Sequence, residues 1–171
     1  MRMERLVIPY IQVLYRSLAC HEDFHPSDLD ILRRSIKFNA AHGITGLLLR
    51  IDEQFFQVLH GPEAEVDALV ARIAVDPRHK YMEVLLREEA PVETPFGNWS
   101  MAYDALMGFE QNLGLQDDGH YPEITPVRAH DLIALFAKTS TSVDAYGSAF
   151  PYSRFPGEED GAYLERLDGL A

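Results

Sequence analysis

The order in which strand-like and helix-like hydrophobic periods follow one another is the feature that most constrains the fold. Residues 11–17 alternate apolar and polar with period two, which places Ile11, Val13 and Tyr15 on one face of a strand. The next apolar residues repeat at helical spacing up to a glycine, Gly43, that is suited to end a helix. The chain therefore opens with a strand followed by a helix.

The same reasoning extends to residue 105. The segments 44–51 and 54–60 read as strands joined by a tight turn, so they are expected to form a hairpin. A second helix is expected to begin near Gly61 and to end at Asp76-Pro77, because proline disfavours helical backbone in the residue before it. Two further strands are expected, over residues 82–86 and 99–105.

This order of elements is the split β-α-β-β-α-β pattern of ferredoxin-like folds, with one strand added. The predicted fold class is α+β, a five-stranded mixed sheet with two helices on one face. The predicted domain spans residues 8–106. Residues 107–171 form a C-terminal extension, with an amphipathic helix near 128–138 that is expected to cover the other sheet face. The tail over residues 143–171 is expected to be loosely ordered, or ordered only against another surface.

Charge and cysteine content narrow the class of partner. The net charge is −12 at pH 7. Such a balance disfavours nucleic acids and anionic membranes, whose phosphates are bound by clusters of lysine and arginine. The only cysteine is Cys20, so no intrachain disulfide is possible and a cytoplasmic location is expected. No apolar stretch approaches about 18 residues, so no transmembrane helix is expected.

Three polar side chains occupy positions where a core would favour apolar ones. Gln57 lies between Phe55 and Leu59 on one strand face, Tyr15 is aligned with Ile11 and Val13, and Asn39 shares a helical stripe with apolar residues. A buried amide without hydrogen-bond partners costs about 1–3 kcal/mol. Either these groups pair with one another, or they face a polar ligand between the helices and the sheet.

Taken together, several short segments resemble the BLUF family, whose members sense blue light using FAD. The resemblance covers roughly residues 10–105 and depends on the order and spacing of its segments. The segments are Leu14-Tyr-Arg-Ser-Leu-Ala19, Asn39 followed by Gly43-Ile-Thr-Gly-Leu-Leu48, Gln54-Phe-Phe-Gln-Val-Leu-His-Gly61, Asp76-Pro-Arg-His79 and Trp99-Ser-Met101. Two positions depart from the family pattern: His60 stands where Glu is frequent, and Phe38 where a second Asn is frequent.

The resemblance implies a role for each matching residue. FAD would lie between the two helices, against the sheet. Tyr15 would donate an electron and a proton, and Gln57 would be the switching amide. Asn39 and Arg78 would hold the flavin carbonyls, and Trp99 and Met101 would exchange places near Gln57. The implied cofactor-binding residues are Tyr15, Ile31, Ser35, Phe38, Asn39, Gln57, Arg78 and His79.

The function implied by this resemblance is that of a blue-light photoreceptor that binds FAD non-covalently and is not an enzyme. It would signal through contact with a downstream protein and is expected to form a homo-oligomer. A flavin-free ferredoxin-like interaction module is the main alternative. A small enzyme of acylphosphatase type is a weaker one, because no anion-binding loop is evident and the acidic balance disfavours phosphate substrates.

Overall fold

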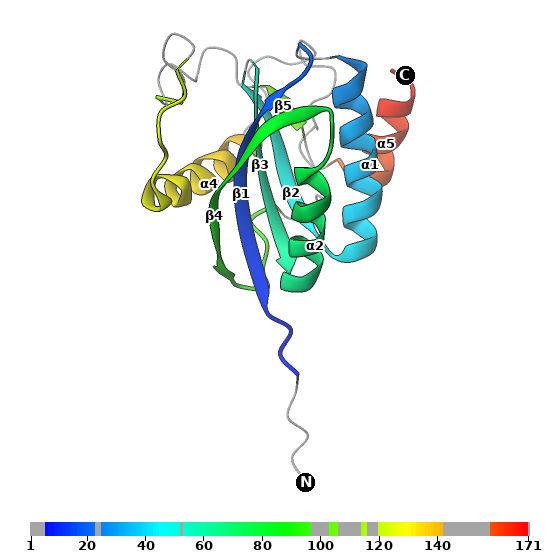
Figure 1. Cartoon of the computed structure of the whole chain (residues 1–171). Coiled ribbons are helices and arrows are strands. Elements are labelled where there is room, and N and C mark those ends of the chain that lie inside the picture. Colours follow the sequence, from blue (N-terminus) through cyan, green and yellow to red (C-terminus); the bar gives the residue numbers. More distant parts are fainter. Residues whose placement is uncertain are drawn as a thin grey trace.

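The structure is a computed structural model that describes residues 6–22, 25–51, 53–96, 103–105, 114–115, 120–141 and 158–170. A β-sheet separates two layers of helices (Figure 1). Four long strands run antiparallel in the order β4-β1-β3-β2, and a short β5 adds to β2 in parallel. The strands are β1 (Tyr10–Ala19), β2 (Thr45–Ile51), β3 (Gln54–Pro62), β4 (His79–Ala90) and β5 (Tyr103–Ala105).

The predicted α+β class is confirmed, and the strand order is that of the ferredoxin-like split pattern. Helix α1 (Pro26–His42) and helix α2 (Glu63–Ala74) pack on one face of the sheet, as predicted. Gly43 ends α1 in the left-handed conformation, with φ of 68°, which glycine adopts without steric cost. The N-cap is His25, whose ring accepts a hydrogen bond from the Ser27 N–H.

Alternation along each strand sends its side chains into two separate cores. On the α1/α2 face, Val13, Leu48 and Leu59 are buried with the apolar stripe of α1. On the opposite face, Leu14, Leu47 and Val58 are buried beneath helix α4 (Pro126–Thr141). The amphipathic helix predicted near 128–138 is therefore part of α4, and it covers the second sheet face (Figure 1).

Strand boundaries near the sheet edges differ from the prediction. β4 has 12 residues rather than the predicted five over 82–86, because charged residues and shifts in its pairing register with β1 interrupt the period-two pattern. Within the described residues, the last strand covers only Tyr103–Ala105. Trp99 and Met101 lie outside the described part of the chain.

Of the two alternatives expected for the tail, order against another surface holds for one segment. Residues Asp160–Asp168 form helix α5, which packs beside α1 rather than on the α4 side (Figure 1). Tyr163 and Leu167 are fully buried in the core that α1 shares with the sheet. An ion pair of 2.6 Å between Arg33 and Asp168 adds to this contact. The extension thus contributes to both helical layers.

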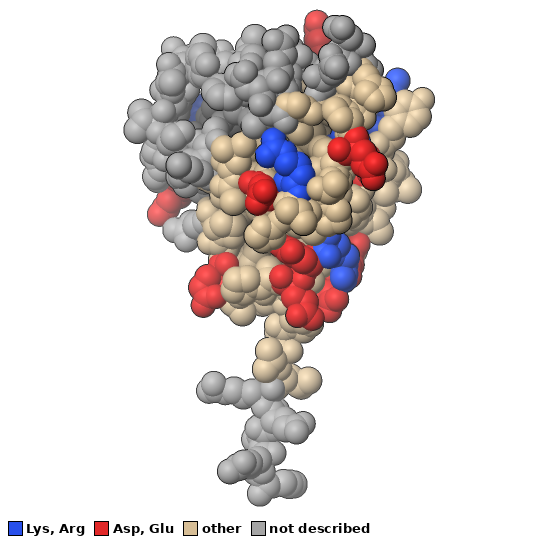
Figure 2. Space-filling model, turned by 90° about the vertical axis from the view of Figure 1, so that its left-hand side faces the viewer, with Lys and Arg blue, Asp and Glu red and all other residues tan. Residues whose placement is uncertain are grey.

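On the side shown in Figure 2, acidic side chains cover more of the described surface than basic ones do, and residues of other kinds cover most of it. Acidic side chains gather there in clusters, and basic side chains lie in small separate groups between them. No helix in the described ranges is long and apolar enough to cross a membrane.

Candidate functional site

A cavity of about 190 Å³ opens between α1, α2 and the sheet. Its walls combine apolar and polar side chains in similar proportion, and buried polar groups lie on the sheet side, as in many sites for planar cofactors. The lining residues are Tyr15, Ile31, Arg34, Ser35, Phe38, Leu48, Phe55, Gln57, Leu69, Arg72, Ile73, Asp76, Arg78 and His79.

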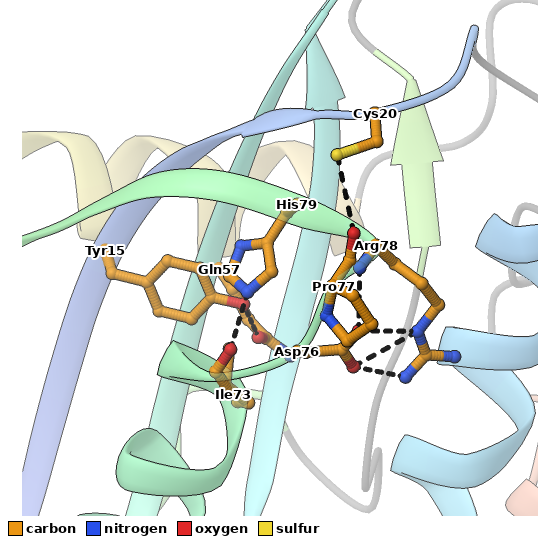
Figure 3. Close-up of polar contacts among 8 residues, drawn as sticks. All are labelled: Tyr15, Cys20, Gln57, Ile73, Asp76, Pro77, Arg78 and His79. Atoms are coloured by element: carbon orange, nitrogen blue, oxygen red, sulfur yellow. Dashed lines mark hydrogen bonds and ion pairs between the residues drawn. The ribbon is translucent and has the colours of Figure 1, made fainter.

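The sheet side of the cavity is marked by a hydrogen-bonded pair of buried polar side chains. Tyr15 on β1 and Gln57 on β3 are directly opposite each other in the antiparallel register, which brings their side chains together. The Tyr15 hydroxyl donates a hydrogen bond to Gln57 Oε1 (Figure 3). Tyr15 is 4% exposed and Gln57 2% exposed. Two of the three polar residues that disturb the apolar pattern therefore partner each other.

Burial keeps Tyr15 protonated. Loss of water around the hydroxyl raises the pKa of Tyr15 well above its ordinary value, and the negative charge of Asp76 raises it further. The phenol is consequently neutral at physiological pH and can act as a hydrogen-bond donor.

The turn after α2 supplies the next group of cavity residues. The Arg78 guanidinium donates hydrogen bonds of 2.9 and 3.1 Å to Asp76, and this interaction holds the pKa of Asp76 below its ordinary value. His79 Nε2 donates to the Ile73 carbonyl over 2.6 Å, and its ring centroid lies 6.2 Å from that of Tyr15. These contacts fix Arg78 and His79 at the cavity wall (Figure 3).

Helix α1 provides the wall opposite α2. Ile31, Ser35 and Phe38 recur at helical spacing and all line the cavity. Phe38 stacks on His42 with centroids 4.0 Å apart. The remaining predicted residue of this helix, Asn39, is fully buried but is not among the lining side chains.

The structure thus brings seven of the predicted cofactor residues to one cavity: Tyr15, Ile31, Ser35, Phe38, Gln57, Arg78 and His79. The sequence analysis included Asp76 in a segment that resembles the family but gave it no role at the site. The spacing of Asp76 and Arg78 was the available signal, because a local ion pair orients the arginine. It also missed Arg34 and Arg72, which carry no sequence signal beyond their charge.

One departure from the family pattern lies away from this cavity. His60 follows Val58 on the alternating strand β3, so its side chain is on the sheet face opposite Gln57. Its Nε2 donates to the Pro91 carbonyl over 2.7 Å, and His60 is buried. The second departure, Phe38, lines the cavity itself.

A comparison with protein families identifies one match, described as sensors of blue light using FAD (BLUF), over residues 10–102. The "Blue light- and temperature-regulated antirepressor BluF" of Escherichia coli (strain K12) is 40% identical over 78 residues, which are 46% of this chain and 19% of that protein. The chain thus spans about a fifth of the length of this curated relative.

Solved structures of BLUF proteins have a similar fold. A photo-activated state of BlsA superposes with a TM-score of 0.65 at 25% identity, covering 75% of this chain and 94% of BlsA. The dark state of BlrB, described as a BLUF protein, superposes with a TM-score of 0.63 at 26% identity, covering 77% of this chain and 97% of BlrB.

Proposed function

The chain belongs to the BLUF family of blue-light sensors, and we propose that it binds a flavin, FAD by family likeness, in the cavity between α1 and α2. The observation that carries this proposal is the buried Tyr15–Gln57 hydrogen bond in the wall of that cavity. A ferredoxin-like interaction module would gain nothing from two polar side chains buried beside a cavity, because apolar residues there would pack without any desolvation cost.

The chemistry of the cavity fits a flavin. Apolar side chains from both helices and the sheet, such as Ile31, Leu48 and Leu69, suit a flat aromatic ring. The Gln57 amide offers a donor end and an acceptor end to the polar edge of such a ring. Arg78, fixed by Asp76, offers further donors at the wall.

A bound flavin supplies blue-light absorption and, once excited, a strong one-electron oxidant. The role proposed for Tyr15 is that of electron and proton donor, since it is a neutral phenol at the cavity wall. Gln57 Oε1 already accepts the hydrogen bond of that phenol, so the proton has a direct route. Rotation or tautomerisation of the Gln57 amide then exchanges donor and acceptor ends without a change in net charge. Trp99 and Met101 remain proposed as the pair that responds to Gln57.

Output is proposed to pass to another protein through the C-terminal extension. The relative in Escherichia coli is named an antirepressor, which suggests signalling by protein contact rather than catalysis by the sensor. Helix α4 covers the sheet face opposite the cavity and is the proposed reporting surface. Self-association and a cytoplasmic location stay predictions.

The visible absorption spectrum of the purified protein tests the proposal. The protein is expected to be yellow, to retain flavin after desalting, and to show a small reversible red shift under blue light. Reconstitution with FAD that leaves no flavin absorbance after desalting would refute flavin binding. It would favour the flavin-free interaction module.

A further inference from the structure

A buried ion pair joins the first turn of α1 to the end of β2. Arg50, the penultimate residue of β2, donates hydrogen bonds of 3.2 and 3.1 Å from Nη1 to the two carboxylate oxygens of Asp28. Each residue is 1% exposed, so both charges are withdrawn from water. The pair connects the helix that walls the proposed flavin cavity to the sheet that forms its other side.

Stability alone does not account for this pair. Moving a charged group out of water costs several kcal/mol per ion, and the attraction between the two charges only about offsets that cost. Apolar residues of similar volume would fill the same space with equal or greater stability. An ion pair, however, has a preferred geometry, whereas apolar side chains can repack in several ways. The pair therefore specifies where α1 begins relative to β2.

Arg50 also contacts two other parts of the molecule near the cavity. Its guanidinium carbon lies 4.7 Å from the centroid of the Phe55 ring, a favourable cation–π distance, and Phe55 lines the cavity. Its Nη2 donates a hydrogen bond to the carbonyl of His21, two residues after the end of β1. In the sheet, Arg50 is opposite Phe55 on β3 and Ala105 on β5. One buried side chain thus contacts α1, Phe55 and the segment that follows the strand of Tyr15.

The position of α1 determines the shape of the cavity. Ile31, Ser35 and Phe38 follow Asp28 by three, seven and ten residues, a spacing that places all four on one stripe of the helix. Those three residues line the cavity, whereas Asp28 does not. Because the hydrogen bonds within a helix make it nearly rigid, a shift or rotation at Asp28 would displace all three relative to the sheet.

We propose that Asp28 and Arg50 are positioning residues of the flavin site, which hold α1 and Phe55 in place against the sheet so that the flavin ring fits tightly. The inference rests on the proposed flavin function and adds two residues that do not line the cavity. The pair contributes to the fit of the ligand and not to the stability of the fold.

An apolar replacement of the pair tests this role. Asp28→Leu/Arg50→Met removes both charges and keeps the approximate side-chain volume. The full chain without flavin is expected to unfold at a urea midpoint equal to or above that of the wild type. The flavin dissociation constant is expected to rise about tenfold, roughly the loss of one hydrogen bond. The vibrational shoulders of the bound flavin's blue absorption band are expected to blur, because a loosely held ring meets more varied surroundings.

An exposed ion pair between the other helix and the sheet provides the matched control. Arg87 on β4 donates hydrogen bonds of 2.9 and 2.7 Å to Asp67 on α2, and neither residue lines the cavity. Exposed ion pairs contribute little to stability. Asp67→Asn/Arg87→Gln is therefore expected to keep the wild-type dissociation constant and absorption band.

The outcomes separate this role from flavin binding itself. A dissociation constant and an absorption band that are unchanged in Asp28→Leu/Arg50→Met would overturn the positioning role while leaving the flavin function intact. A urea midpoint well below that of the wild type, or failure of this variant to fold, would overturn it as well, since the pair would then serve stability. Equal changes in the control variant would also overturn it. A wild-type chain that binds no flavin would overturn both proposals.

Discussion

A double-mutant cycle on Tyr15 and Gln57 tests the core of the proposed site. Tyr15→Phe keeps the ring and removes the hydroxyl, and Gln57→Leu keeps the approximate volume and removes both ends of the amide. The two residues are directly opposite each other on neighbouring strands, and both are almost fully buried. Removing one partner therefore takes a hydrogen bond from a group that has little water to replace it.

The size of the expected loss of stability follows from this burial. Each single substitution is expected to lower the free energy of unfolding by about 1–3 kcal/mol, the cost of a buried polar group that loses its partner. The double variant removes both polar groups together and replaces them with apolar ones of similar size, which can be nearly neutral. Its loss is therefore expected to be smaller than the sum of the single losses, with an interaction energy of about 1–2 kcal/mol.

Urea unfolding of flavin-loaded protein at fixed flavin concentration measures the cycle, and difference spectroscopy under blue light measures the photocycle. Both single variants are expected to keep flavin, because ring burial and other polar contacts remain. Both are expected to lose the normal reversible red shift. Strictly additive losses of stability would show that the pair is not coupled. A wild-type red shift and recovery in either variant would refute the role assigned to that residue.

Three further predictions concern other residues of the two helical layers and the cavity. Because the folded-state pKa of Tyr15 is raised, the stability that the protonated phenol contributes is present below about pH 10 and is lost as the pH rises above it. Tyr15→Phe should therefore flatten the fall in unfolding free energy with pH above about pH 10. An unchanged slope of unfolding free energy against pH would contradict this. Tyr163→Ala should lower the free energy of unfolding by about 3–5 kcal/mol in urea unfolding. Leu170→Ala is the control and should change it little, because Leu170 is half-exposed. A loss below about 1 kcal/mol for Tyr163→Ala would show that α5 does not unfold together with the core. Asn39 is buried and does not line the cavity, whereas Ser35 does. The family resemblance nevertheless predicts that Asn39→Ala raises the flavin dissociation constant more than Ser35→Ala does, by about tenfold if a buried amide hydrogen bond is lost. Equal constants would refute a flavin contact for Asn39.

Much of the fold follows from hydrophobic period, because the central strands and both main helices bury one clearly defined face. Local sequence pattern did not reveal the full length of β4 or the presence of α5. β4 is an edge strand that pairs along its length with β1, but charged residues and shifts in the pairing register interrupt its period-two pattern. Helix α5 has nine residues, too few to be stable alone. It depends on packing of Tyr163 and Leu167 against α1, which no local pattern reveals.

The site was predictable where a polar residue violated the apolar pattern. Tyr15 and Gln57 each occupy a core position, are buried and line the cavity, whereas Asn39, also buried, does not line it. The exposed lining residues Arg34 and Arg72 violate no pattern, because arginine is ordinary on the outer side of a helix. That they line one cavity is visible only once α1 and α2 are placed side by side.

Side chains along β1 and β3 alternate between the two faces of the sheet, so the strands that form the site also contact the opposite face. Tyr15 points into the cavity, while its neighbour Leu14 packs in the core under α4 and Arg16 donates to the Pro122 carbonyl just before that helix, over 2.7 Å. On β3, Gln57 lies between Phe56 and Val58, which belong to the same core as Leu14. Because protein interiors are close-packed, a shift of β1 or β3 that follows a change in the Tyr15–Gln57 bond must also displace groups packed against α4. The central strands therefore give the proposed switch a direct mechanical route to the C-terminal extension.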